Sequence, residues 1–235
     1  MSHAPVWMLL PEPHLADKRG NAYYLVPLDG NLHQVKLADM TVDRGHKPPM
    51  SVNYFQSGRR LLTEHLPTAL LPGHDRPRKA VKPGAAEIPD YAGSGKGQVV
   101  SFRFREVIET LEPGQHQFEP VQIQWKDGPT EDRFWFNPVG RVFSLDPDAS
   151  EPPVQYYPLE NNPVHPRKDR PPFIFDTRTH ADEWAPVFQH DWMGGRHVFC
   201  DGEFGGYVFI SDALNSALDA AGVSGYLTRG PFRVV

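Results

Sequence analysis

Apolar residues recur with a helical period in one segment of the chain, residues 99–114, which reads VVSFRFREVIETLEPG. Four of them fall at i, i+3, i+4 and i+7 and share one helix face: Phe104, Val107, Ile108 and Leu111. Ser101 precedes this face, and its hydroxyl can accept a hydrogen bond from the free amides of a first helical turn. Pro113 and Gly114 stop the helix. The pattern predicts a strand that ends at Val100 and a helix over about residues 102–112.

The same pattern returns 110 residues later in FISDALNSALDAAG, residues 209–222. Ser211 takes the place of Ser101, and Gly222 supplies the left-handed residue that often ends a helix. The apolar face comprises Leu214, Ala217, Leu218 and Ala221. We therefore expect a second capped helix over about residues 212–221. Two such strand–serine–helix units arise either by internal duplication or as an ordinary arrangement in an α+β protein, and the sequence leaves both explanations open.

Alternation with a period of two predicts short strands around these helices. Val121, Ile123 and Trp125 share one face of FEPVQIQW, the turn KDGP follows, and RFWFN returns as the second strand of a hairpin. HVFC and YVFIS flank DGEFGG and predict another hairpin. Nearer the N-terminus, VWMLL, AYYLVPL and LHQVKL are expected strands, and VNYFQSGRRLL is an expected hairpin around Ser57 and Gly58.

The fold class that follows is α+β, with mixed, mostly antiparallel short strands and two short capped helices packed on sheet. Proline breaks strand ladders and ends helices, and the chain has 25 prolines among its 235 residues, so we also expect many loops. Three regions are expected: a β-rich N-terminal subdomain over residues 1–71, a flexible Pro/Gly linker or loop over 72–98, and an α+β domain over 99–235.

Composition narrows the function classes. The net charge of −5 argues against a nucleic-acid binder, which usually presents a basic face, and it suits a basic protein partner. No apolar run approaches the roughly 20 residues of a membrane helix. Cys200 is the only cysteine, which excludes an internal disulfide and favours a reducing compartment. We therefore expect a cytoplasmic protein that binds neither nucleic acid nor membrane.

The sequence contains no established catalytic motif. GSGKG at residues 93–97 has Asp90 where the first glycine of a phosphate loop belongs, and Gly97 replaces its hydroxyl residue. G-x-S-x-G, H-E-x-x-H and C-x-x-C patterns are absent. The densest group of potential ligands is FQHDWMGGRHVFCD, and an enzyme would use its His190, His197 and Cys200. We expect no metal, no cofactor and no catalysis.

Eight residues are predicted to contact a protein partner. Acidic residues outnumber basic ones between residues 126 and 151, which would suit a basic partner. Two tryptophans lie in a less regular segment, and tryptophans often anchor interfaces. Ordinary solvated turns and semi-buried structural tryptophans are the competing explanations. The predicted partner-binding residues are Asp127, Glu131, Asp132, Asp146, Asp148, Glu151, Trp184 and Trp192.

Several segments, in their order along the chain, resemble the bacterial immunity family numbered eleven among the polymorphic-toxin systems, formerly a domain of unknown function. The resemblance covers roughly residues 99–228 and is carried by helix caps and core positions. The matching segments are Ser101 with its helix, HQFEPV at 116–121, HVF at 197–199, ISDALNSAL at 210–218, and Gly222 to Gly225.

The resemblance implies a non-enzymatic protein that binds and neutralises a cognate toxin by occlusion, with the toxin encoded by an adjacent gene. It supplies no catalytic residues and no cofactor. Two other functions stay open. One is a scaffold or ligand-binding module of the same fold, and the other is an enzyme that uses His190, His197 and Cys200.

Overall fold

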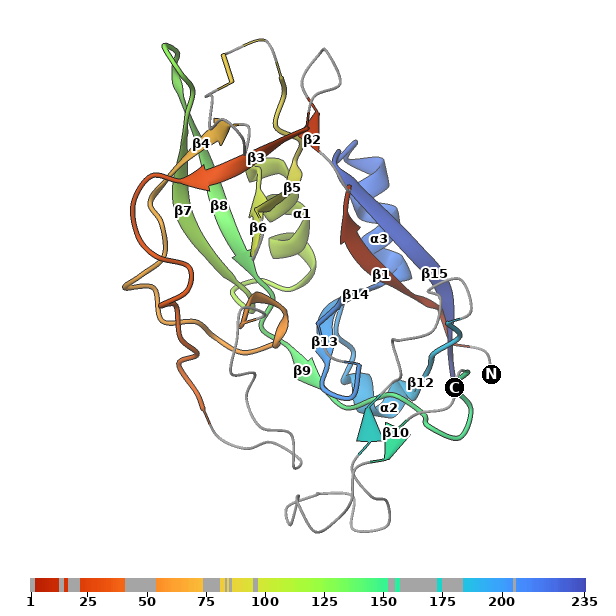
Figure 1. Ribbon diagram of the computed structural model, residues 1–235. Coiled ribbons are helices and arrows are strands. Elements are labelled where there is room, and N and C mark those ends of the chain that lie inside the picture. The colour runs from red at the N-terminus through yellow and green to blue at the C-terminus, as the bar shows by residue number, and fades with distance from the viewer. Residues whose placement is uncertain are drawn as a thin grey trace.

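The fold comes from a computed structural model of the chain (Figure 1). The structure describes residues 3–12, 15–16, 22–40, 54–73, 81–82, 84, 86–94, 97–151, 155–156, 173–174, 184–204 and 206–235. Within these residues, the strands form a six-stranded sheet, a seven-stranded sheet and a two-stranded pair. Together with three α-helices in the same part of the chain, they confirm the α+β fold class.

The six-stranded sheet gathers strands from both ends of the sequence. β1 is antiparallel to β15 on one side and to β14 on the other. In spatial order the strands are β12 (Val187–Phe188), β15 (Tyr226–Val234), β1 (Val6–Pro11), β14 (Val208–Ser211), β13 (Val198–Asp201) and β9 (Arg141–Val142). A strand from the region 1–71 thus lies inside a sheet whose other strands come from the region 99–235.

The seven-stranded sheet is built around the β7–β8 hairpin, which the sequence predicted. In spatial order its strands are β2 (Leu15–Ala16), β3 (Ala22–Pro27), β4 (Ala69–Gly73), β7 (Gln117–Gln124), β8 (Thr130–Asn137), β6 (Gly97–Val100) and β5 (Tyr91–Ser94). The small pair consists of β10 (Gln155–Tyr156) and β11 (Phe173–Ile174). Strand β5 lies within residues 72–98, the region expected to be a linker or loop.

Both predicted helices are present and both are capped as expected. Ser101 Oγ accepts a hydrogen bond from the Phe104 amide at 3.2 Å, at the start of α1 (Phe102–Leu111). Ser211 Oγ accepts from the Leu214 amide at 3.1 Å, at the start of α3 (Asp212–Ala220). The structure adds a single-turn helix, α2 (His190–Met193), and a short 3-10 turn, η1 (Tyr54–Gln56), which the sequence did not predict.

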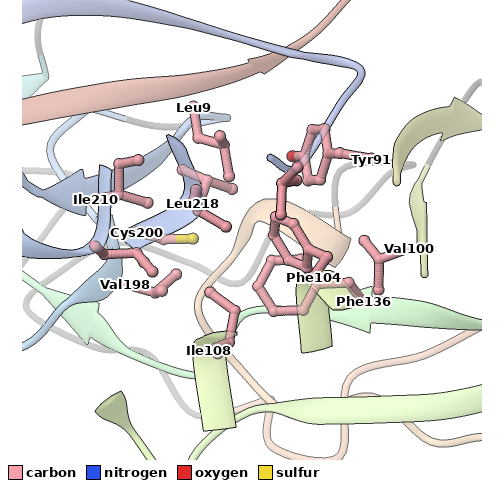
Figure 2. Close-up of a cluster of buried hydrophobic side chains, with 13 residues drawn as sticks. Leu9, Tyr91, Val100, Phe104, Ile108, Phe136, Val198, Cys200, Ile210 and Leu218 are labelled. Atoms are coloured by element: carbon pink, nitrogen blue, oxygen red, sulfur yellow. The ribbon is translucent and has the colours of Figure 1, made fainter. Parts of the chain in front are cut away.

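Helices α1 and α3 lie between the two sheets (Figure 1), and their apolar faces meet in a central cluster. Phe104 and Ile108 of α1 pack there with Leu218 of α3, against apolar side chains from both sheets (Figure 2). Two further clusters cover the outer faces. Phe188 and Phe209 belong to the one on the six-stranded sheet, and Trp135 belongs to the one on the seven-stranded sheet.

The two sheets share one topology. Five neighbouring strands follow the same order in both, β4-β7-β8-β6-β5 in one and β12-β15-β1-β14-β13 in the other. In each set the first pair is parallel and the next three pairs are antiparallel. A serine-capped helix follows β6 in one set and β14 in the other. This agreement, together with the sequence pattern, favours the internal duplication. Strand β1 is the counterpart of β8 and comes from the other end of the sequence.

Two expected elements near the N-terminus are wrong. LHQVKL forms a turn followed by a single bridge from Leu37 to Leu61 and not a strand. VNYFQSGRRLL forms η1 and turns where a hairpin was expected, and its first residues, 52–53, lie outside the described residues. The physical reason is a long-range partner, because the side-chain amide of Gln117 binds both the N–H and the carbonyl of Leu61 at 2.9 and 3.0 Å.

Candidate functional site

The predicted partner-binding residues divide into two surface groups. The hairpin group comprises Asp127, Glu131 and Asp132 on β8 and the turn before it. The β9–α2 group comprises Asp146, Asp148, Glu151, Trp184 and Trp192, near β9, β12 and α2. These elements lie at opposite ends of the molecule in Figure 1, with the tip of the β7–β8 hairpin at the top and β9, β12 and α2 at the bottom. The eight residues therefore do not form one continuous site.

In the hairpin group, Asp127 and Asp132 are exposed and Glu131 is tied to the fold. Asp127 lies in the turn between the strands and has a positive φ of 57°, which aspartate tolerates better than most residues. Glu131 pairs with Arg133, whose Nε lies 2.6 Å from a Glu131 carboxylate oxygen. Asp132 accepts a hydrogen bond from the Gln122 side chain at 3.2 Å on the neighbouring strand.

A groove of about 560 Å³ lies against this hairpin. It is lined by Thr68, Pro120, Val121, Gln122, Asp132, Arg133 and Phe134, and we call it the hairpin groove. Beside it, an arginine stacks on two rings that face α1: the guanidinium of Arg105 lies 4.7 Å from the ring centre of Phe134 and 5.5 Å from that of Phe118. Sequence reasoning missed these three residues, because the contact joins a helix to two strands.

In the β9–α2 group, Asp146 and Trp184 are engaged in contacts within the protein, whereas Asp148, Glu151 and Trp192 are exposed. The Asp146 carboxylate accepts hydrogen bonds from the amides of Asp148 and Ala149 at 3.0 and 3.2 Å, and from the Gln189 side chain at 2.9 Å. Asp146 thus closes its own turn and fastens it to the segment before α2.

The two tryptophans of this group differ. Trp184 packs edge-on against Phe204 and Tyr207, with ring centres 5.6 Å apart in both cases. It also helps to line a groove of about 590 Å³ beside β15, together with Glu151, Arg229 and Arg233. Arg229 lies over the Trp184 ring at 5.3 Å. Trp192, on α2, is 44% exposed.

The structure brings together two of the three residues of the enzymatic alternative: His190 and His197 line a pocket of about 220 Å³, and Cys200 is not part of its lining. Cys200 is buried in the central cluster (Figure 2), and burial raises the pKa of its thiol to about 12, so the nucleophilic thiolate is not formed at neutral pH. His197 Nδ1 lies 2.8 Å from Ser211 Oγ, the cap of α3. His190 is half exposed and stacks on His3 with ring centres 4.1 Å apart.

In the described part of the chain, no group of three or more histidine, cysteine, aspartate or glutamate residues could hold a metal ion. Among the same residues, no helix has both the length and the apolar character needed to cross a bilayer.

A buried polar network that no sequence pattern predicted joins the two halves of the fold. Glu112, at the end of α1, accepts hydrogen bonds from the amides of His197 and Val198 at the start of β13, both at 2.9 Å. Its carboxylate also binds Nε2 of His116 at 2.7 Å. The other ring nitrogen of His116 accepts the Val139 amide at 3.0 Å, so a neutral ring carries its proton on Nε2.

The charge of Glu112 is stabilised by these partners. Burial alone would raise the pKa of Glu112, but the hydrogen bond from His116 and the amide hydrogen bonds outweigh burial, so the pKa of this carboxyl lies below its usual value. Since the network connects α1 with β13 and lies away from both grooves' linings, we assign it a structural role.

Comparison with known proteins gives one family. The model of an immunity protein family, Imm11, matches residues 37–229, which is more than half of the 235-residue chain. The matched region begins well before residue 99 and takes in β4, β5, both capped helices and the first four residues of β15. It leaves out β1 (Val6–Pro11). A search of curated proteins gives no match.

Proposed function

We propose that this chain, which belongs to the Imm11 immunity protein family, neutralises one cognate bacterial toxin by binding it and covering its working surface. The family match over residues 37–229 confirms the resemblance seen in the sequence, and it is the observation that carries the proposal. The toxin would belong to a polymorphic toxin system used in competition between bacteria. It would be encoded by an adjacent gene, and the immunity protein would act in the cytoplasm of the producing cell.

Inhibition by occlusion needs a firm surface and no chemistry. A stable protein interface buries about 800 Å² on each partner, and the chain exposes 12174 Å² in total. The two helices are packed between the sheets, and the Glu112 network fastens α1 to β13. This packing supports a surface that changes little on binding. Such preorganisation reduces the entropy lost in the complex. The buried thiol of Cys200 likewise supports a binding role over a catalytic one.

Co-expression with the product of the neighbouring gene tests the proposal. We expect the neighbour alone to stop growth, co-expression to restore growth, and the two proteins to co-purify. A matched control is Leu218→Asp, which places a charge in the fully buried central cluster and should abolish both rescue and complex by unfolding the protein. Toxicity without rescue or complex would contradict the proposal and favour a scaffold or ligand-binding module.

Alanine variants separate occlusion from catalysis. His190→Ala, His197→Ala and Cys200→Ala, each checked for folding by circular dichroism, are expected to rescue growth as well as the wild-type protein. A folded variant that binds the toxin but no longer protects the cell would show that these side chains act chemically, and it would contradict occlusion.

A further inference from the structure

We propose that the toxin docks on the hairpin groove, placing an apolar side chain against Pro120 and Phe134 and a basic segment against the acidic rim of the groove. The inference rests on the proposed function, because it names the surface through which the toxin is held. It also selects the hairpin group over the β9–α2 group.

The floor of the groove is a sheet face that the described part of the chain leaves uncovered. Along β7, Val121 and Ile123 are buried on one face, whereas Pro120, Gln122 and Gln124 are exposed on the other. In Figure 1 the hairpin extends past α1, so the helix shields only the lower part of this face. An exposed apolar surface with polar surroundings is the usual arrangement of an interaction site.

The end of the groove has the residue types that dominate binding energy at protein interfaces. Phe118 and Phe134 meet edge to face with ring centres 6.5 Å apart, and both rings are partly exposed. Arg105 lies over both rings. Its stacked guanidinium is held in place before the partner arrives, so little entropy is lost on binding. Arginine and aromatic residues are enriched among hot spots.

Three carboxylates lie around the groove, and the one arginine of its lining, Arg133, is already paired with Glu131. Asp132 lines the groove, Asp127 lies in the adjoining turn, and Asp29 binds Thr68 on the opposite side. The hydrogen bond from Thr68 lowers the pKa of Asp29, so its negative charge is favoured there. Lys126, in the same turn, is the basic residue nearest in sequence to Asp127. A basic segment of the toxin complements this rim and would be steered toward it.

The groove beside β15 fits a basic segment less well. Arg229 and Arg233 line it opposite a single carboxylate, Glu151. A lysine or arginine of the partner would meet two like charges there. Trp184 is already packed against two rings of the outer cluster, and Asp146 is engaged in its own turn.

Two matched pairs of variants test the surface, with the toxin affinity measured by titration calorimetry or biolayer interferometry. Asp132→Lys reverses a charge on the rim, and Asp148→Lys makes the same change at an exposed site of the other group. Arg105→Ala removes the stacked guanidinium, and Arg103→Ala removes an arginine of the same helix that binds the Gly222 carbonyl at 3.2 Å near α3.

We expect Asp132→Lys and Arg105→Ala to raise the Kd at least about tenfold, and Asp148→Lys and Arg103→Ala to leave it within about twofold. Association of the wild-type protein should slow with added salt, and less so for Asp132→Lys. Should the lysine variant fail to fold, Asp132→Asn keeps the shape and removes the charge, and it should also weaken binding.

The results that overturn the surface differ from those that overturn the function. Wild-type affinity in both Asp132→Lys and Arg105→Ala, or a loss confined to Asp148→Lys, would assign the toxin to another surface while toxin binding itself stands. A dimer in light scattering that Asp132→Lys dissociates, with toxin affinity unchanged, would assign the groove to a second copy of the chain. No binding by the wild-type protein would overturn both proposals.

Discussion

Glu112 is the residue whose replacement should show most clearly how the two halves of the protein are joined. In Glu112→Gln, the amide oxygen can still accept from the Val198 amide and the His116 ring, but the new NH2 group would then face the His197 amide, a donor that the carboxylate accepted from. A lost hydrogen bond to a charged group costs about 1.5–3 kcal/mol, and a buried donor left unpaired costs about 1–3 kcal/mol. Because the side chain can relax, we expect the free energy of unfolding to fall by about 2–4 kcal/mol.

The effect of this change should depend on pH in a defined direction. The pKa of Glu112 is lowered in the folded protein, so its ionised form contributes stability above the pKa of an unfolded glutamate, about 4.3. That contribution is lost as pH falls through the lower folded pKa. The stability difference between the wild-type protein and Glu112→Gln should therefore be largest near pH 7 and should shrink below about pH 4.

Urea unfolding at a series of pH values measures the loss in the free energy of unfolding and its dependence on pH. In thermal unfolding at neutral pH, the melting temperature of Glu112→Gln should be lower by roughly 5–15 °C. The control is Glu106→Gln, because Glu106 is an exposed glutamate on the same helix and should change stability by less than about 0.5 kcal/mol. A loss for Glu112→Gln no larger than that of the control, or one that persists unchanged in acid, would refute the reasoning.

Three further predictions concern the fold. Ser101→Ala and Ser211→Ala remove equivalent caps and should each lower the free energy of unfolding by about 1 kcal/mol, with threonine restoring most of it, as measured by urea unfolding. Gly225→Ala should be far more destabilising than Gly114→Ala. Both glycines have a positive φ, but only at Gly225 would the new Cβ lie 2.3 Å from a neighbouring side-chain carbon. Equal melting temperatures of the two variants would contradict this. Tyr91→Phe should be neutral or stabilising by up to about 1 kcal/mol, because the buried hydroxyl has no hydrogen-bond partner among the described residues, and a marked loss on thermal unfolding would show otherwise.

The helices and the longest hairpin were predictable because their signals are local. A cap such as Ser101 acts on amides three residues away, and a helix face is written within one or two turns. The β7–β8 hairpin combines alternation with a short turn. The family was also recognisable, since its resemblance is carried by these caps and core positions.

Other features depend on contacts between distant parts of the sequence. The segment around Leu61 lost its expected hairpin to a side-chain amide, that of Gln117, 56 residues away. In the sequence, Asp132 and Asp146 are both acidic residues near strands, and nothing there distinguishes their roles. In the structure, Asp132 lines a groove and Asp146 closes a turn. Arg105 was not selected, because its aromatic partners lie on strands that meet the helix only in the folded chain.

The connections between the strands explain why only one of the two units with this shared topology offers the proposed docking face. In the first unit, β7 and β8 are consecutive, so they pair along their whole length to Gln124 and Thr130 and extend beyond α1 as a hairpin. In the second unit, their counterparts β15 and β1 lie at opposite ends of the sequence, so no turn joins them and no hairpin extends past α3. The acidic rim and the stacked Arg105 belong to the first unit alone. One immunity chain should therefore bind one toxin, and a purified complex that contains two toxins per chain would contradict the hairpin groove as the docking surface.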